Sequence, residues 1–517
     1  MADVPFPAGL GAGGRLLPDS ERAFYAMDVY RAGAVPRAVA RPETIEELRA
    51  IVMEAAEAGL AIVVRGGGVS YTDAYLTRAA DTLLIDTGAL DGIVAINEQD
   101  MLVTVQPGIS WAKLDQILEP RGLKVPFVGT FSGLAASVGG TISQNANGHG
   151  SNAAGISADS VVAIELLTPS GAFVRTSTSG AAVAQAHYRN FGPDLAGLFT
   201  GDAGTLGIKT AIILKLVRRK PAFEAASFAF PDFATLHACM ARIASERIED
   251  KSFGLDLALS QGQIARQDAG SMLSVARAVW RSSPGAFSAL RSLASMAAAG
   301  RRVLASAPFA SHYIVDGHSA VEARAKLGAL REIAHGFGRE IANSVPTVVR
   351  SMPFQPLHNM LGPRGERWVP LHGLLPHSQV LDFHKAFTAY VGSRQGDMKA
   401  AKVHCGAMFS CIGASTFLYE PAFYWEDERT EFHERMMDPA YLAGLPRYPA
   451  NPMGAALVEE MRTHIIDLMH AHGAGHFQVG KLYPYTRDRD EGALRLLRAI
   501  KHELDPRGLL NPGALGL

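Results

Sequence analysis

Four glycine-rich segments are the residues of this 517-residue sequence whose types and spacing point most directly to ligand binding. Successive backbone N–H groups in a glycine turn form a concave site for phosphate oxygens. A single glycine run is usually a turn. Four runs predict a long ligand threaded between loops, with a pyrophosphate on one run and a flat ring on another. They are Gly66–Gly68, Pro126–Gly155, Gly201–Ile208 and Gly473–Gly480.

Two familiar phosphate-binding motifs do not account for these runs. A Rossmann site needs G-x-G-x-x-G at the start of a helix within a βαβ unit. Gly66–Gly68 instead leads into "VSYTDAY", and the run at Gly201 leads into the strand-like "IKTAIILKL". No G-K-[ST] follows any of the glycines, so a Walker A loop is excluded as well.

Short helices and strands position the glycine runs. A helix that ends near Gly59 is predicted by the capping box of Thr44 and Glu47. The strand "AIVVR" leads directly into Gly66–Gly68, and "TLLIDT" and "MLVTVQPG" are also typical strands. Ser110 caps a helix that stops at Gly122. The first 220 residues therefore predict an α+β fold.

Later segments continue this mixture. "SVVAIELLTPSGAFVRT" predicts a hairpin, and residues 210–219 predict one strand. After Lys220 the helical patterns are longer. In residues 263–307, six arginines and a single acid predict a helical layer with solvated arginines, in preference to a membrane- or partner-facing pair. The tail predicts an amphipathic helix with a stripe of Leu494, Leu497, Ile500 and Leu504.

Composition excludes several classes of protein. The chain is 48% hydrophobic and 19% charged with a net charge of −1, which gives no overall attraction to nucleic acid or anionic membranes. Cys239, Cys405 and Cys411 have neither disulfide-framework nor zinc spacing. We find no secretory signal and no run of 18 apolar residues. We expect a cytoplasmic protein with no membrane span.

Taken in order, the motifs resemble the flavoproteins related to vanillyl-alcohol oxidase and p-cresol methylhydroxylase. "VVRGGGVSYTDAY" looks like the pyrophosphate loop of that family, and "SVGGTISQNANGHG" like its flavin-facing segment. "GDAGTLGIKTAIILKL" looks like the loop and strand that close the FAD domain, and "LDPRGLLNPG" like the C-terminal signature. Together the motifs are specific, whereas each alone is weak. The middle of the chain shows little resemblance.

The resemblance implies an α+β fold with a two-part FAD-binding domain of the PCMH type and a separate α+β cap for the substrate. The FAD domain is expected at 1–220, the cap at 221–472, and the segment returning to the FAD domain at 473–517. The FAD-binding residues that it implies are Arg65, Gly66, Gly67, Gly68, Val69, Ser70, Asp73, Gly129, Gly133, Ser137, Val138, Gly139, Gly140, Thr141, Asn145, Gly148, His149, Gly150, Gly204, Gly207, Ile208, Lys481 and Asn511.

The first glycine run carries the main expectation about FAD. Its backbone is expected to donate N–H bonds to the pyrophosphate, with Ser70 and Asp73 shaping the turn. Many family members have a histidine directly after the three glycines, linked covalently to the flavin. This chain has Val69, which cannot form that link. We therefore predict non-covalent FAD, and a histidine or tyrosine of the middle domain is the alternative tether.

By the same resemblance, the substrate loses a hydride to the flavin, which oxygen or another carrier then reoxidises. Such a site needs a group that accepts a hydroxyl proton and often a cation near the flavin. "HFQVGKLYPYTR" offers Lys481 or Arg487 as the cation and His476, Tyr483 or Tyr485 for the proton. Alternatively, the two tyrosines simply pack in the domain interface.

Further polar residues fall in the cap. Tyr419 and His404 complete the set of candidate catalytic residues; Glu420, His372, His377 and Arg350 are each equally explained as satisfied core or surface residues. A metal site drawn from His404, Cys405 and His476 lacks tight spacing. The H-x-G-D-G-N-x-H motif of the glycolate and D-lactate dehydrogenase branch is absent from the sequence. We expect no metal.

Three functions compete at this point. The leading hypothesis is an FAD enzyme that oxidises a small organic alcohol or a para-substituted phenol, because "RWVPLHGLLPHS" and the tyrosines resemble the phenol-oxidising members. The alternative is a 2-hydroxy-acid or sugar-alcohol dehydrogenase, for which an arginine or lysine would bind the substrate carboxylate. A flavin-binding protein without turnover is a third class. The electron acceptor and the oligomeric state, including a homo-oligomer, stay open; nucleic acid is not an expected partner.

Overall fold

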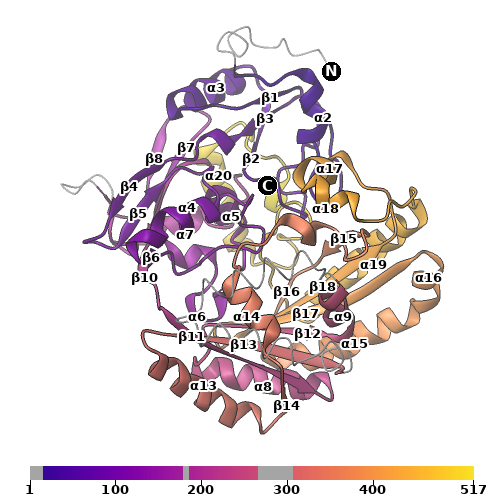
Figure 1. Cartoon of the computed structure of the whole chain (residues 1–517). Coiled ribbons are helices and arrows are strands. Elements are labelled where there is room, and N and C mark those ends of the chain that lie inside the picture. Colours follow the sequence, from indigo (N-terminus) through magenta and orange to yellow (C-terminus); the bar gives the residue numbers. More distant parts are fainter. Residues whose placement is uncertain (1–14, 149, 179–184, 266–306) are drawn as a thin grey trace. The chain divides into compact units, whose positions relative to one another are not determined.

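The computed structural model describes residues 15–148, 150–178, 185–265 and 307–517 (Figure 1). His149 and residues 266–306 of the arginine-rich stretch, both singled out in the sequence, lie outside the described residues. Backbone contacts divide the chain into two compact units. Unit 1 comprises Met1–Gly148, Ile156–Val217 and Phe477–Leu517; unit 2 comprises His149–Gly155 and Arg218–His476.

Unit 1 begins with a parallel sheet that leads into the first glycine run. Its order is β1-β3-β2, and Arg65 at the end of β2 pairs with Asp86 at the end of β3. Thr44 and Glu47 form the predicted capping box of α3, and Gly59 follows that helix with φ +74°. The elements are β1 Ala38–Ala40, α3 Ile45–Glu57, β2 Ala61–Arg65 and β3 Thr82–Asp86.

A second, antiparallel sheet of unit 1 has the order β4-β5-β9-β7-β8. The predicted hairpin is confirmed, since β7 and β8 pair across the turn at Gly171. The single strand predicted at 210–219 is wrong: pairing with β7 starts β9 at Ile208, and the strand ends at Lys215. The strands are β4 Ile93–Asn97, β5 Leu102–Val105, β7 Val161–Leu167, β8 Phe173–Arg175 and β9 Ile208–Lys215, with the two-residue β6 Leu123–Lys124 and β10 Val217–Arg218 apart.

Helices of unit 1 follow the predicted caps. Ser110 caps α4 through the N–H of Lys113, and Gly122 adopts φ +67° beyond the 3-10 turn that ends it. The tail helix α20 is amphipathic as expected, with Leu494 buried and Asp505 at its end. The helices are α2 Arg22–Tyr25, α4 Trp111–Leu118, α5 Val138–Gln144, α7 Leu195–Leu198 and α20 Glu491–Leu504.

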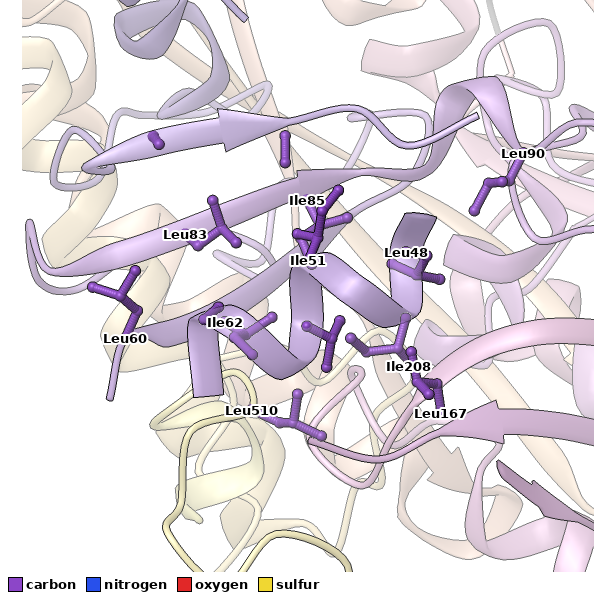
Figure 2. Packing of buried hydrophobic residues seen from close by; sticks show 14 residues of the cluster. Leu48, Ile51, Leu60, Ile62, Leu83, Ile85, Leu90, Leu167, Ile208 and Leu510 are labelled. Atoms are coloured by element: carbon purple, nitrogen blue, oxygen red, sulfur yellow. The ribbon is translucent and has the colours of Figure 1, made fainter. Parts of the chain in front are cut away.

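The C-terminal segment is built into the core of unit 1. Leu510 lies among apolar side chains from α3, β2, β3, β7 and β9 (Figure 2). Beside β2, the N–H of Ile62 donates to the carbonyl of Leu509 (2.8 Å), and the N–H of Asn511 donates to the carbonyl of Ile62 (2.8 Å). The tail therefore extends the parallel sheet and holds Asn511 close to the first glycine run.

Unit 2 contains a large antiparallel sheet that the sequence did not predict strand by strand. Its order is β14-β11-β13-β12-β17-β18-β15, and β16 also pairs with β18. The expected α+β class of the cap is confirmed. The strands are β11 Ala222–Phe230, β12 Lys251–Asp256, β13 Phe309–Gly317, β14 Arg339–Ile341, β15 Arg367–Pro370, β16 Gly373–Pro376, β17 Val403–Ile412 and β18 Thr416–Trp425.

Helices cover this sheet through apolar stripes. α8 buries Phe233, Leu236, Met240 and Ile243 at helical spacing and contacts β11, β13 and β17. α19 buries Leu457, Met461, Ile465 and Met469 and contacts β16 and β18. The helices of the unit are α6 Ser151–Ala154, α8 Phe233–Glu246, α9 Leu257–Ala265, α13 Ala320–Ala334, α14 Ser344–Ser351, α15 Val380–Ser393, α16 Gln395–Ala400, α17 Glu431–Met436, α18 Pro439–Ala443 and α19 Pro452–Ala471.

One short segment differs from the sequence-based division. Residues 149–155, expected in the first domain, cluster with unit 2. The cause is Asn152, whose side-chain amide donates to Ser252 Oγ and to the carbonyl of Cys411, both at 2.8 Å. Gly150, an expected FAD-binding residue, therefore starts a helix of unit 2.

Candidate functional site

The first glycine run is packed directly against the second. A Cβ atom on Gly67 would lie 1.8 Å from the carbonyl oxygen of Ala135, and one on Gly66 would lie 2.2 Å from Ser137 Oγ. Because real Cβ contacts below 3.0 Å essentially never occur, only glycine fits at these two positions. The sequence explained the run by the approach of a ligand; the structure adds that it lets two chain segments touch.

The second run opens helix α5. Ser137 caps it by accepting from the N–H of Gly140 at 3.2 Å, and Thr141 accepts from the indole N–H of Trp111 at 2.9 Å. A Cβ on Gly139 would lie 2.6 Å from the side chain of Pro107. These residues thus hold α5 beside the first run. Val138 is buried, Gly133 closes a turn onto Thr130, and a Cβ on Gly148 would lie 2.2 Å from the carbonyl oxygen of Gly129.

The third run is tied to the end of α5. The N–H of Gly201 donates to the carbonyl of Ile142 (2.9 Å), and Ala203 donates to that of Ser143 (2.7 Å). Gly204 has φ +70° with no atom within 4 Å of its Cβ position, while Gly207 lies against Leu166 just before Ile208 starts β9. Asn145 ends α5 in the left-handed region at φ 49°.

The C-terminal segment completes the arrangement. Asn511 donates its side-chain amide to the carbonyls of Ala74 (2.9 Å) and Ala203 (2.6 Å), which joins the first and third runs. The N–H of Lys481 donates to the carbonyl of Thr72 at 3.0 Å, and its ammonium group to that of Leu76 at 2.6 Å. Four segments far apart in sequence therefore meet in unit 1.

Polar atoms left without partners gather on these segments. Within the described residues, several buried side-chain atoms have no hydrogen-bond partner: Arg65 Nε and Nη2, Gln144 Oε1, Asn147 Oδ1, Asp202 Oδ2 and Asn511 Oδ1. Buried polar atoms in native proteins are nearly always bonded. A ligand with acceptors for a cation and donors for amide oxygens would satisfy this set. FAD has both, in its pyrophosphate and in its ribityl and flavin groups, so the residues present fit it.

Arg65 is the most unusual member of this set. Its side chain is buried against the aromatic rings of Phe24, Tyr25 and Tyr75, at 5.4, 4.8 and 5.5 Å from their centroids. A Cβ on Gly68 would lie 2.1 Å from Arg65 Nη2, so the guanidinium lies directly beside the first run. A buried cation without a carboxylate partner is costly unless an anion binds nearby.

The rest of the first loop is held from below by acids. Asp73 forms an ion pair with Arg31, and its N–H donates to Asp28 at 3.2 Å. Asp28 is fully buried, and this burial, with the charge of Asp73, raises its pKa to about 7. Ser70 Oγ accepts from the N–H of Thr72 at 3.3 Å. Val69 is half-buried and offers no atom for a flavin link.

The predicted catalytic residues divide between the units. In unit 1, burial and the charge of Arg78 lower the pKa of Lys481 to about 8. Tyr483 is buried, Tyr485 lies under the guanidinium of Arg489 (4.1 Å), and Arg487 is exposed. His476, Tyr419 and His404 belong to unit 2. The structure therefore does not bring all seven together within one unit.

Tyr419 and His404 have structural partners in unit 2. The hydroxyl of Tyr419 and His384 Nδ1 are 2.8 Å apart, and the ring lies among Phe233, Phe383, Phe387 and Phe409. Burial raises the pKa of Tyr419 well above its usual range. His404 stacks on Tyr424 with ring centroids 5.0 Å apart. These contacts favour packing roles for both residues.

A polar cluster surrounds His476 instead. His476 Nδ1 donates to the carbonyl of His372 at 2.6 Å, and His372 Nε2 lies 3.8 Å from Glu420 Oε2. The charge of Arg462, on α19, helps to lower the pKa of His372 to about 3, although burial is the larger cause. The sequence named His372 and Glu420 only singly and missed Arg462, because strand pairing, not spacing, brings them together.

Two structural searches complete the description. Among the described residues, no three histidine, cysteine, aspartate or glutamate side chains are grouped so that they could hold a metal ion. No helix in the described part of the chain is long and apolar enough to cross a membrane.

Comparisons with known proteins agree with this geometry. Residues 36–177 match the family model "FAD binding domain", and residues 451–515 match "FAD linked oxidases, C-terminal domain". The chain therefore carries an FAD-binding domain of this type and the C-terminal domain of FAD-linked oxidases. This confirms the recognised resemblance and the expected enzyme class, an FAD-linked oxidoreductase.

Similar proteins extend the comparison. The chain is 27% identical over 215 residues to D-lactate dehydrogenase [cytochrome] 1, mitochondrial, of Saccharomyces cerevisiae, covering 41% of this chain and 35% of that protein. It is 30% identical over 184 residues to glycolate oxidase subunit GlcD of Bacillus subtilis, covering 36% and 37%. The matched part thus spans little more than a third of each relative.

A solved structure shows the same fold over nearly the whole chain. A substrate-bound p-cresol methylhydroxylase superposes with a TM-score of 0.68, covering 98% of this chain and 95% of that one, at 14% identity. The two-part architecture expected from the sequence is confirmed. At this identity the likeness concerns the fold alone.

Proposed function

We propose that the protein is an FAD-dependent dehydrogenase or oxidase that converts a small 2-hydroxy acid to the 2-oxo acid. The observation that carries this proposal is the convergence, in unit 1, of four glycine-rich segments on buried polar atoms without partners among the described residues. An ordinary turn-rich core would satisfy these atoms internally. A large polar cofactor supplies what they lack.

FAD would be held by the first and second glycine runs, by Arg65, and by Asn511 and Lys481. Arg65 would offer its charge to the pyrophosphate, since its nearest neighbours are aromatic rings. Bound FAD supplies the two-electron acceptor for a hydride. Val69 in place of a histidine favours non-covalent attachment. Oxygen or another redox carrier would take the electrons onward.

The substrate class follows the relatives more closely than the fold neighbour. The yeast and Bacillus proteins carry names that refer to D-lactate and glycolate. The prediction of an alcohol or phenol substrate has weaker support, because p-cresol methylhydroxylase resembles this chain only in fold. The alternative raised by the sequence, a 2-hydroxy acid, is therefore the one that we propose.

Among the candidate catalytic residues, we favour His476 and Lys481 over the rest. His476 is part of the polar cluster of unit 2, and Lys481 is tied to the first loop. Tyr483 and Tyr485 stay candidates for contact with the substrate. Arg487 is exposed, which makes it a weaker candidate for a charge beside the flavin.

The visible spectrum of the purified protein, before and after acid precipitation, tests the cofactor proposal. We expect a flavin band that moves to the supernatant. A band that stays in the pellet would show a covalent link and overturn the non-covalent proposal. No band after incubation with FAD would overturn the assignment of the FAD site. Failure of any 2-hydroxy acid to bleach a bound flavin would leave a binding protein without turnover, or a phenol oxidase.

A further inference from the structure

The polar cluster of unit 2 is assembled by four parts of the chain. His372 immediately precedes β16, and Glu420 lies on β18, whose neighbour Tyr419 pairs with Gly373 of β16. Successive residues of a strand point to opposite faces. Because Tyr419 faces the aromatic core, Glu420 points to the other face, toward His372.

Helix α19 and the segment after it close the cluster. A Cβ on Gly373 would lie 3.1 Å from the side chain of Met469, so α19 packs tightly on β16. Arg462 lies seven residues earlier on the same face of that helix and is buried. After the helix, Gly475 and Leu374 exchange hydrogen bonds of 2.9 Å, which fixes His476 beside His372.

Glu420 is the member of this cluster with the fewest partners. Within the described part of the chain, the only polar side-chain group recorded near its carboxyl group is His372 Nε2, at 3.8 Å. The side chain keeps 16% of its exposure while that of His372 keeps 1%. Water and small molecules can therefore reach Glu420, whereas His372 serves as a fixed neighbour.

We propose that Glu420 is the catalytic base of this protein and that Arg462 favours the binding of an anionic substrate beside it. The inference rests on the proposed function. The Glu420 carboxylate takes the hydroxyl proton of the 2-hydroxy acid, so that the O–H bond breaks. The adjacent C–H bond breaks with its electron pair, which leaves as a hydride to the flavin. A C=O bond forms, the substrate is oxidised and the flavin is reduced by two electrons.

The surrounding charges are consistent with this role. Burial raises the pKa of Glu420 to about 8, close to the value that suits a base working near neutral pH. His372, with its pKa near 3, and His476, with its pKa lowered to about 4 chiefly by burial, are both neutral there. Arg462, ion-paired with the half-exposed Glu459, and His470, beyond His476, complete the charged and titratable groups recorded around the site.

His476 adds orientation to the cluster. Because a carbonyl oxygen can only accept, its bond to His372 places the proton on Nδ1 of His476 and leaves Nε2 as an acceptor. His476 therefore acts as a positioning residue that fixes the backbone before β16. Its tautomer is set by the fold and does not change with the substrate.

Anaerobic stopped-flow reduction of the holoenzyme, with D-lactate and glycolate as probes and p-cresol as comparison, tests the inference. In the wild type we expect the rate of flavin reduction to rise about tenfold per pH unit and to level off above pH about 8. Glu420→Gln should lose this rise and reduce the flavin roughly 10²- to 10⁴-fold more slowly. Glu426→Gln, just beyond the same strand and exposed, is the matched control and should behave as the wild type.

The outcomes separate the two proposals. If no 2-hydroxy acid reduces the wild-type flavin, the proposed substrate class is wrong; if p-cresol reduces it, the same Glu420→Gln comparison is made with p-cresol. If the wild type is reduced but Glu420→Gln keeps its rate and pH profile, the inference is wrong. Should Glu420→Gln fail to fold, an infrared pH titration of the wild type and Glu420→Asp decides. A protonated carboxyl that titrates near pH 8 and shifts in Glu420→Asp supports the inference, and its absence overturns it.

Discussion

The contact between the first two glycine runs leads to a quantitative prediction for Gly67→Ala. The added Cβ would lie 1.8 Å from the carbonyl oxygen of Ala135, and the shortest tolerable contact is 3.0 Å. The loop must therefore move by at least 1.2 Å, the difference of these two values. The atom in the way belongs to the backbone, which cannot rotate aside. Overpacking of this kind costs about 1–3 kcal/mol.

We expect two measurable effects of this change. The melting temperature of the protein without cofactor should fall by roughly 2–12 °C, given about 2–4 °C per kcal/mol for a domain of this size. FAD should bind at least about tenfold more weakly, because the loop that approaches it is displaced. Differential scanning calorimetry and quenching of flavin fluorescence measure the two effects separately.

Gly328→Ala is the control for the substitution itself. Gly328 lies within α13, where a Cβ would meet no atom within 4 Å, so alanine there should stabilise by roughly 0.5–1 kcal/mol. If Gly67→Ala melts with the wild type and binds FAD equally well, the argument from close packing is refuted. If it melts lower but binds FAD normally, the loop is structural only.

Three further changes test other parts of unit 1. Arg65→Met removes a buried cation, so the cofactor-free protein should melt at the same or a higher temperature while FAD binds at least about tenfold more weakly; equal FAD affinity would contradict the role of Arg65. Asp28 has a pKa of about 7 when folded against 3.8 in its reference state, so its contribution to stability is complete below pH 3.8 and is lost as pH rises to about 7. This loss amounts to up to about 4 kcal/mol, and urea unfolding should show that Asp28→Asn removes the slope, whereas an unchanged slope would assign it elsewhere. Lys209→Met leaves Asp202, its partner at 2.6 Å, as a buried unpaired acid and should cost about 3–5 kcal/mol in the same assay; a loss below 1 kcal/mol would show that Asp202 takes up a proton at little cost.

Local signals in the sequence predicted local structure well. Thr44 with Glu47, Ser110 and Gly122 lie where predicted, because a cap depends on residues within one turn of the helix. The gathering of the glycine runs was expected only through the family resemblance. Nothing in the spacing of Gly67 and Ala135 shows that they touch, since that contact depends on the fold of 68 intervening residues.

The polar cluster of unit 2 lay beyond the reach of sequence patterns. β16 has four residues and ends in proline, so it shows no alternation from which its pairing with β18 follows. That pairing decides which side of the sheet Glu420 faces. Arg462 sits in the buried stripe of α19, a position where a charge contradicts the amphipathic pattern. A charged residue inside such a stripe is the signal that could have identified it.

An anaerobic titration of the flavin-loaded protein with D-lactate and glycolate tests the central claim most directly. The account predicts that the visible flavin band bleaches in proportion to the 2-hydroxy acid added, with one equivalent reducing one flavin. A band that neither acid bleaches, while p-cresol does, would contradict the proposed substrate class. A protein that binds no flavin at all would contradict the whole account.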